Sequence, residues 1–181
     1  MSVRMTISRT SDRSDTPYVV APPPVIFLAA LVLGLVLHAS QPLPVFTPSL
    51  AARVVGGCLI LGGLALSGAV MRHFGRAGTP VVPWQETRRL VVTGPYRFSR
   101  NPDYVGQALV VVGVGVLLAA PWVLLALVPA LLVVRYGVIA REERYLERRF
   151  GEEYRRFCGR VRRWALDIGL GRHVNESGAI Q

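Results

Sequence analysis

The chain has 181 residues, enough for about one domain, and 51% of them are hydrophobic while only 18% are charged. This composition, with a mean hydropathy of +0.40, argues against a disordered chain and against an ordinary soluble enzyme. The formal net charge is +10, and Arg alone supplies the positive charge because the sequence contains no lysine. Nucleic-acid binding is not indicated, since the arginines lie between long uncharged stretches and form no stripe with aromatic residues.

Neither a metal site nor a disulfide framework is predicted. The two cysteines, Cys58 and Cys158, lie in an apolar run and in a charged segment, and the three histidines are scattered. No Cys or His pair has the spacing of a metal-ligand motif, so each cysteine is interpreted as a small apolar side chain.

Three long uncharged stretches indicate helices that cross a membrane. Residues 16–52 have their apolar centre at 25–37, and residues 54–71 form a second stretch. Each suits one helix across an apolar layer about 30 Å thick. Residues 104–134 are long enough for two short spans, and Pro121 near their middle predicts a helical hairpin that turns there. The sequence therefore predicts an all-α integral membrane protein with about four transmembrane helices, at about 22–40, 52–71, 102–120 and 122–139.

The arginines predict the orientation of these helices. They precede the first span, recur through 72–103 and crowd the tail from residue 135, whereas the segment between the first two spans has only Arg53. By the positive-inside rule both termini are cytoplasmic, and we expect a bacterial inner-membrane protein. Residues 1–39 could alternatively form a cleaved signal peptide, but the basic residues lie far upstream of the apolar run. We expect a retained span after a disordered segment at 1–16.

Local signals mark the start of the third span. Gly94-Pro95 indicates a turn, Asn101 is a favourable N-cap residue, and Pro102 suits the first helical position. Taken alone, these residues form a well-made helix start.

Residues 140–164 predict a cytoplasmic amphipathic helix, bent at Gly151. Its apolar positions recur every three or four residues, as expected of one stripe on a helix that lies at the membrane interface. The acidic and basic residues around this stripe are typical of a solvated face. Glu142 and Glu143 differ because they directly follow the apolar run that ends at Ala140. A carboxylate at membrane depth needs a partner or a cationic ligand.

Two motifs carry a resemblance to a known family. The segments LVVTGPYRFSRNPDYVG and EERYLERRFGEEYRRFCGRVRRW, separated by the predicted hairpin, resemble the isoprenylcysteine carboxyl methyltransferases, which belong with the phospholipid methyltransferases. The resemblance covers about residues 75–164. It implies a membrane methyltransferase domain at 17–164 with a tail at 165–181, and S-adenosylmethionine as methyl donor in a cytoplasmic pocket. It also implies a lipophilic small-molecule, lipid or lipidated acceptor that arrives from the bilayer.

The resemblance also implies which residues bind the donor. They are Leu90, Val91, Tyr96, Asn101, Pro102, Tyr104 and Glu142. Arg135 and Arg141 are candidates for substrate binding, because they lie near Val138, where the prenylcysteine enzymes carry an Arg. Asn101 replaces the usual His of the family, and we expect it to act by position, as a side-chain cap of the third span. Methyl transfer by direct displacement requires no metal and no covalent nucleophile, so no catalytic residue is assigned.

Two other functions remain open at this point. A membrane reductase of related architecture would use NADPH instead of S-adenosylmethionine. A non-catalytic membrane scaffold would use the cytoplasmic helix to bind a partner or anionic lipid. The acceptor's reacting group could be a carboxylate, amine, thiol or hydroxyl, and the sequence specifies no oligomeric state.

Overall fold

A computed structural model describes residues 21–44, 47, 49–77, 90 and 92–164. Within these residues every regular element is helical, which confirms the predicted all-α class. The elements are α1 (Pro23–Ser40), α2 (Leu50–Ala77), the 3-10 helix η1 (Gly94–Arg97), α3 (Pro102–Leu117), α4 (Pro121–Val133), the π-helical segment η2 (Val134–Ile139) and α5 (Ala140–Arg160). The predicted disordered segment at 1–16 and the tail at 165–181 lie outside the described residues.

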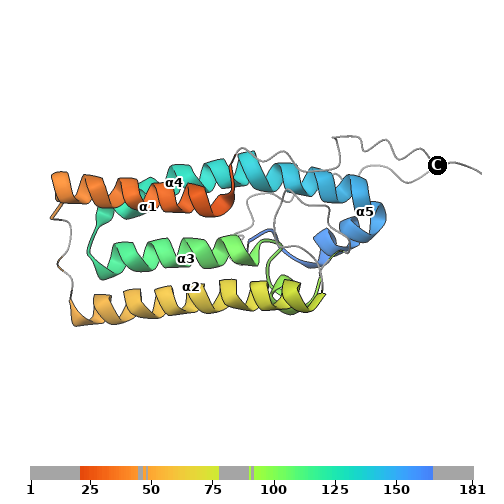
Figure 1. The fold of residues 1–181 in the computed structure, drawn as a ribbon, viewed down its shortest axis with the longest axis horizontal. Helices are drawn as coiled ribbons and strands as arrows, with labels where there is room; N and C mark the ends of the chain where they lie inside the picture. The colour runs from red at the N-terminus through yellow and green to blue at the C-terminus, as the bar shows by residue number, and fades with distance from the viewer. Residues whose placement is uncertain (1–20, 45–46, 48, 78–89, 91, 165–181) are drawn as a thin grey trace, which may run out of the picture.

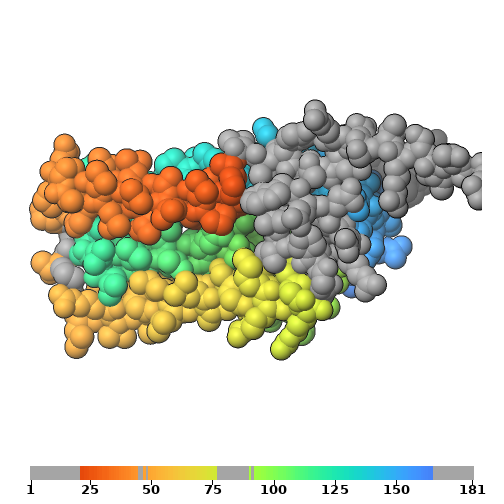
Figure 2. Space-filling model, in the orientation of Figure 1, coloured from red at the N-terminus to blue at the C-terminus, as the bar shows by residue number. Residues whose placement is uncertain are grey.

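The four long apolar helices form two antiparallel pairs, α2 with α3 and α1 with α4 (Figure 1). The α3–α4 turn lies at one end of the bundle, and α5 projects from the other, which we call the α5 end. On the face seen in Figure 2, side chains of α3 fill the space between α1 and α2. The α5 end therefore gathers the start of α1, the end of α2 and the start of α3.

Three helical stretches are long and apolar enough to cross a membrane, namely Pro23–Ser40, Leu50–Arg76 and Pro121–Phe150. The helix Pro102–Leu117 is apolar but shorter. Large apolar side chains on the outside of the bundle are exposed, among them Leu28, Val36, Leu61, Leu64 and Val128. Such a surface is stable in lipid, because apolar side chains there need no cover from other helices.

The fourth predicted span and the predicted amphipathic helix are continuous. The boundary expected near residue 139 coincides with the step from η2 to α5, and α4, η2 and α5 follow one another without a break. No Pro or Gly cap stands between Val138 and Glu142, so nothing stops the helix where the apolar residues end. The expected bend at Gly151 is present, with φ 50° and ψ −120° inside α5.

The hairpin turn is built by two neighbouring residues. Pro121 begins α4, where its missing N–H costs no helical hydrogen bond. Ala119 adopts a positive φ of 50°, which ends α3 at Leu117, short of the expected residue 120. At the same end, the Trp122 indole Nε1 donates a 2.7 Å hydrogen bond to the Gln41 carbonyl oxygen, which joins the end of α1 to the start of α4.

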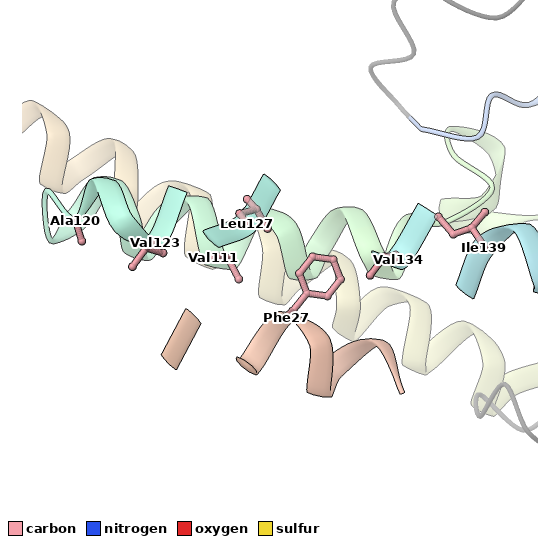
Figure 3. Packing of buried hydrophobic residues seen from close by; sticks show 7 residues of the cluster. All are labelled: Phe27, Val111, Ala120, Val123, Leu127, Val134 and Ile139. Atoms are coloured by element: carbon pink, nitrogen blue, oxygen red, sulfur yellow. The ribbon is translucent and has the colours of Figure 1, made fainter. Parts of the chain in front are cut away.

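A small apolar core holds α1 against the hairpin. Figure 3 shows the ring of Phe27 reaching from α1 towards residues of α3 and α4. The cluster consists of Phe27, Val111, Ala120, Val123, Leu127, Val134 and Ile139. Tyr104 and Trp164 pack against it from the α5 end, so the core reaches the region where the candidate site lies.

Helices α2 and α3 approach each other through glycines. A Cβ atom built on Gly113 would lie only 2.7 Å from the carbonyl oxygen of Gly56 and 2.7 Å from a side-chain carbon of Ile60. Small residues at such contacts let two helix backbones pack closely in a membrane, where dispersion supplies most of the attraction. This contact fixes the position of α3 along α2.

Gly113→Ala is therefore expected to lower the free energy of unfolding by about 1–3 kcal/mol, the usual effect of overpacking a close contact. Thermal unfolding in detergent micelles, followed by circular dichroism, measures the change. Gly62→Ala is the matched control, because no atom lies within 4 Å of a Cβ built there. If the two variants were equally stable, α2 and α3 would not be in this close contact.

Candidate active site

The start of α3 meets the start of α5 through a partly buried polar contact. Tyr104 is the third residue of α3, and its hydroxyl donates a 2.8 Å hydrogen bond to Oε1 of Glu142, the third residue of α5. The two side chains are half-buried, and Tyr104 packs against the apolar core. The phenol satisfies one oxygen of a carboxylate that stands at the end of an apolar helix.

Tyr96 and Asp103 lie around the same carboxylate. Burial raises the pKa of the Tyr96 phenol, and the negative charges of Asp103 and then Glu142 raise it further. The phenol therefore stays protonated at neutral pH and can donate a hydrogen bond. Two carboxylates and two tyrosines thus form an acidic, aromatic cluster in a protein whose net charge is +10.

The end of α2 holds Tyr96 in place. The Tyr96 ring packs edge-on against Phe74, with ring centroids 5.7 Å apart. One residue earlier in α2, His73 Nε2 is hydrogen-bonded to Thr93 Oγ1 at 2.8 Å. Gly94 follows with φ 63°, and a Cβ built there would lie 2.9 Å from the His73 ring. Only glycine suits both that backbone conformation and that contact.

Asp103 and Gln107 form a polar pair that sequence reasoning missed. Gln107 Nε2 donates a 2.7 Å hydrogen bond to Asp103 Oδ2, one helical turn away. Gln107 Oε1 is buried, and among the described residues it has no hydrogen-bond partner. The signal available in the sequence was the four-residue spacing of an Asp and a Gln at the start of an apolar helix.

The expected side-chain cap by Asn101 is wrong. Asn101 does occupy the N-cap position of α3, but its side chain makes no capping hydrogen bond. Its Nδ2 donates instead to the Arg163 carbonyl oxygen at 3.1 Å. The Ser99 hydroxyl accepts a hydrogen bond from the Asn101 backbone N–H and donates to the same Arg163 oxygen, each at 3.1 Å. The side-chain amide of Asn101 therefore binds the backbone carbonyl of Arg163, which follows α5, and not the backbone of the first turn of α3.

The other predicted residues are placed as follows. Pro102 is fully buried at the first position of α3, and Leu90 is half-buried in the segment before η1. Val91 lies outside the described residues. Arg135 lies in η2, with its guanidinium carbon 5.6 Å from the centroid of the Tyr136 ring.

The two candidate substrate arginines differ in environment. Arg135 lies in an apolar stretch, its Nε is buried, and no hydrogen-bond partner for that atom exists among the described residues. Arg141 is exposed on α5. In the described part of the chain, no three His, Cys, Asp or Glu side chains come together as a metal site.

The position of Asn101 generates a stability test. Asn101→Asp removes the N–H donor and sets a carboxylate against the Arg163 carbonyl, so the free energy of unfolding should fall by about 1–3 kcal/mol. Asn101→His keeps a ring N–H and should stay close to the wild type. Thermal unfolding in micelles distinguishes them. A capping role predicts the opposite for Asp, which is among the best N-cap residues, so an Asn101→Asp protein of wild-type stability would restore that role.

Comparison with known proteins supports the resemblance noted in the sequence. The phospholipid methyltransferase family matches residues 51–153, more than half of the chain. A protein of Haemophilus influenzae described as uncharacterized is 59% identical over 34 residues, which are 19% of this chain and 54% of that protein. This chain thus spans about half the length of the curated relative that it matches. No solved structure matches it.

The family match extends from the start of α2 into α5, so it contains both Tyr104 and Glu142. It also covers most of the apolar helices that are long enough to cross a membrane. The chain belongs to the phospholipid methyltransferase family.

Proposed function

We propose that the protein transfers a methyl group from S-adenosylmethionine to a lipophilic acceptor at the cytoplasmic face of the membrane. The observation that carries this proposal is the hydrogen-bonded pair Tyr104–Glu142, set beside Asp103 and Tyr96 at the α5 end. Tyr104 and Glu142 are 38 positions apart in the chain, and their hydrogen bond joins the two segments that carry the family resemblance.

The residues of this cluster fit the charge of the donor. S-adenosylmethionine carries an ammonium and a sulfonium, and when bound it supplies the electrophilic methyl group. Glu142 and Asp103 offer the negative charge that such cations need, and the Tyr96 and Tyr104 rings offer aromatic faces. We propose Leu90, Tyr96, Asn101, Pro102, Tyr104 and Glu142 as the described residues that hold the donor, together with Val91.

Each proposed role is one of binding or orientation. Glu142 pairs with the ammonium or accepts a hydrogen bond from a hydroxyl of the donor, through the oxygen that Tyr104 leaves free. Tyr104 fixes the rotamer of that carboxylate. Pro102 and the apolar core below it exclude water from the site. Alignment of the two reactants and exclusion of water are the main contributions a protein makes to a direct displacement.

Arg135 is our candidate for the polar group of the acceptor. The Arg135 guanidinium lies near the Tyr136 ring, but its buried Nε has no hydrogen-bond partner among the described residues, which is costly in an apolar helix. An acceptor with an anionic group and an apolar tail, moving laterally in the bilayer, would satisfy it. Arg141 is the weaker candidate, because its side chain is exposed. Incubating membrane extracts with labelled donor and identifying the product by mass tests the acceptor, and Arg135→Met should reduce its labelling.

Donor binding is tested by two substitutions. Tyr104→Phe and Glu142→Gln should each weaken S-adenosylmethionine binding about ten- to a hundredfold, because a hydrogen bond to a charged group contributes about 1.5–3 kcal/mol. Isothermal titration in micelles measures it. Glu147→Gln is the control, since Glu147 lies on the same helix but is exposed and paired with Arg155 at 2.9 Å. Wild-type protein that bound NADPH and not S-adenosylmethionine would favour a reductase, and binding of neither would favour a scaffold.

The face of the membrane is tested by cysteine labelling. In a background with Cys58 and Cys158 replaced by alanine, Phe98→Cys should be labelled from inside and Leu118→Cys from outside by a membrane-impermeant maleimide. Both positions are exposed, at 74% and 48%, and lie at opposite ends of α3. If Leu118→Cys were labelled from the inside, the orientation predicted from the arginines would be reversed.

A further inference from the structure

Glu143 has partners unlike those of its neighbour Glu142. Its carboxylate lies 3.1 Å from Nη1 of Arg100, and it accepts hydrogen bonds from Nε and Nη2 of Arg163, the Nε bond being 3.0 Å long. The Glu143 side chain is 18% exposed, and those of Arg100 and Arg163 are 17% and 29% exposed. Two guanidinium groups thus hold one largely buried carboxylate, in a fork geometry that Arg favours.

The chain after α5 returns to the start of α3. We call residues 161–164 the C-terminal strap. The Arg100 backbone N–H donates to the Arg162 carbonyl oxygen at 2.9 Å, while Ser99 Oγ and Asn101 Nδ2 both donate to the Arg163 oxygen at 3.1 Å. Three consecutive residues before α3 therefore bind the strap, and Trp164 packs on the apolar core beside them.

Arg100 connects the strap to α5 as well. Its Nη1 donates to Sγ of Cys158 at 2.9 Å in addition to its contact with Glu143. Ser99, which is 3% exposed, is the buried polar residue beneath this arrangement. The start of α3, the start of α5 and the strap are thus linked by groups that are largely withdrawn from water, where ion pairs are screened least.

We propose that Glu143 is a positioning residue of the methyltransferase, and that it holds the C-terminal strap, through Arg163 and Arg100, as a wall of the donor site. This inference rests on the proposed function. Glu142 and Glu143 then have separate tasks: Glu142 contacts the donor, and Glu143 fixes the segment from Ser99 to Tyr104 against α5. The strap lies beyond residue 153, where the match to the family model ends.

The charge arrangement gives Glu143 a second effect on the same site. With Glu143 ionised, Arg100 and Arg163 are both paired with it. Loss of the Glu143 charge removes this partner from the Arg100 and Arg163 guanidinium groups. Glu142, whose carboxylate the donor needs, is the next residue in the chain. Either guanidinium group would then compete with the cationic donor for Glu142.

A double-mutant cycle on Glu143 and Arg163 tests the inference. Glu143→Gln and Arg163→Gln should each weaken S-adenosylmethionine binding about tenfold, and the double variant should be little worse than either single one. The matched control is the same cycle on Glu147 and Arg155, an exposed ion pair of the same helix, which should leave binding unchanged. Glu143→Asp, which keeps the charge, should retain most of the affinity.

A second readout follows the strap itself and does not require the donor. Trypsin cleavage after Arg162, identified by mass spectrometry, should be about tenfold faster in Glu143→Gln than in the wild type and unchanged in Glu147→Gln. If cleavage were unchanged in Glu143→Gln, Glu143 would not hold the strap. If cleavage accelerated while donor affinity and turnover stayed at wild-type values, the strap would not be a wall of the donor site. Either result overturns the inference.

The two readouts also separate this inference from the proposed function. Wild-type protein that failed to bind S-adenosylmethionine would overturn the proposed function, and the role of the strap in donor binding with it. Wild-type binding that was insensitive to the Glu143 and Arg163 substitutions would overturn only the inference.

Discussion

A carboxylate at the end of an apolar helix needs a hydrogen-bond or charge partner, and Glu142 is such a carboxylate. Its partner, Tyr104, comes from a helix on the other side of the hairpin, so the distance between the two elements has to be held within a hydrogen bond of 2.8 Å. The glycine contact between α2 and α3 fixes the position of α3 along α2, and the Pro121 turn fixes where α4 begins. The contacts of His73 with Thr93 and of Phe74 with Tyr96 hold η1 against α2. Each of these contacts lies away from Glu142, yet together they hold the elements around it in place.

The sequence predicted the features that depend on local composition. Hydropathy located the helices, and Pro121 located the hairpin, because apolar length and a missing backbone N–H act within a few residues. Gly151 was predicted to bend the last helix for the same reason. The family motifs also selected Tyr104 and Glu142, whose hydrogen bond joins residues 38 positions apart in the chain.

The features that failed prediction depend on distant segments. Asn101 carries a strong capping signal, but the Arg163 carbonyl, 62 positions away, takes its side-chain amide. Glu143 looked like its neighbour in the sequence, since nothing local says that Arg100 and Arg163 converge on it. The continuous α4–η2–α5 helix was missed for another reason, because a change from apolar to polar residues marks the membrane boundary but does not end a helix. The contact that Asn101 makes in place of a cap uses a side-chain N–H donor. Histidine, the usual residue of the family at this position, also has such a donor.

Gly151 allows the end of the chain to return to the start of α3. Arg163 follows Glu143 by 20 residues, and in a straight helix they would be about 30 Å apart. The turn at Gly151, where φ is positive, brings the chain back instead, and Figure 1 shows it approaching the start of α3. Because synthesis proceeds from the N-terminus, the four apolar helices are made before the strap. The contact between Glu143 and Arg163 can therefore form only after these helices have been made, and it depends on the turn at Gly151.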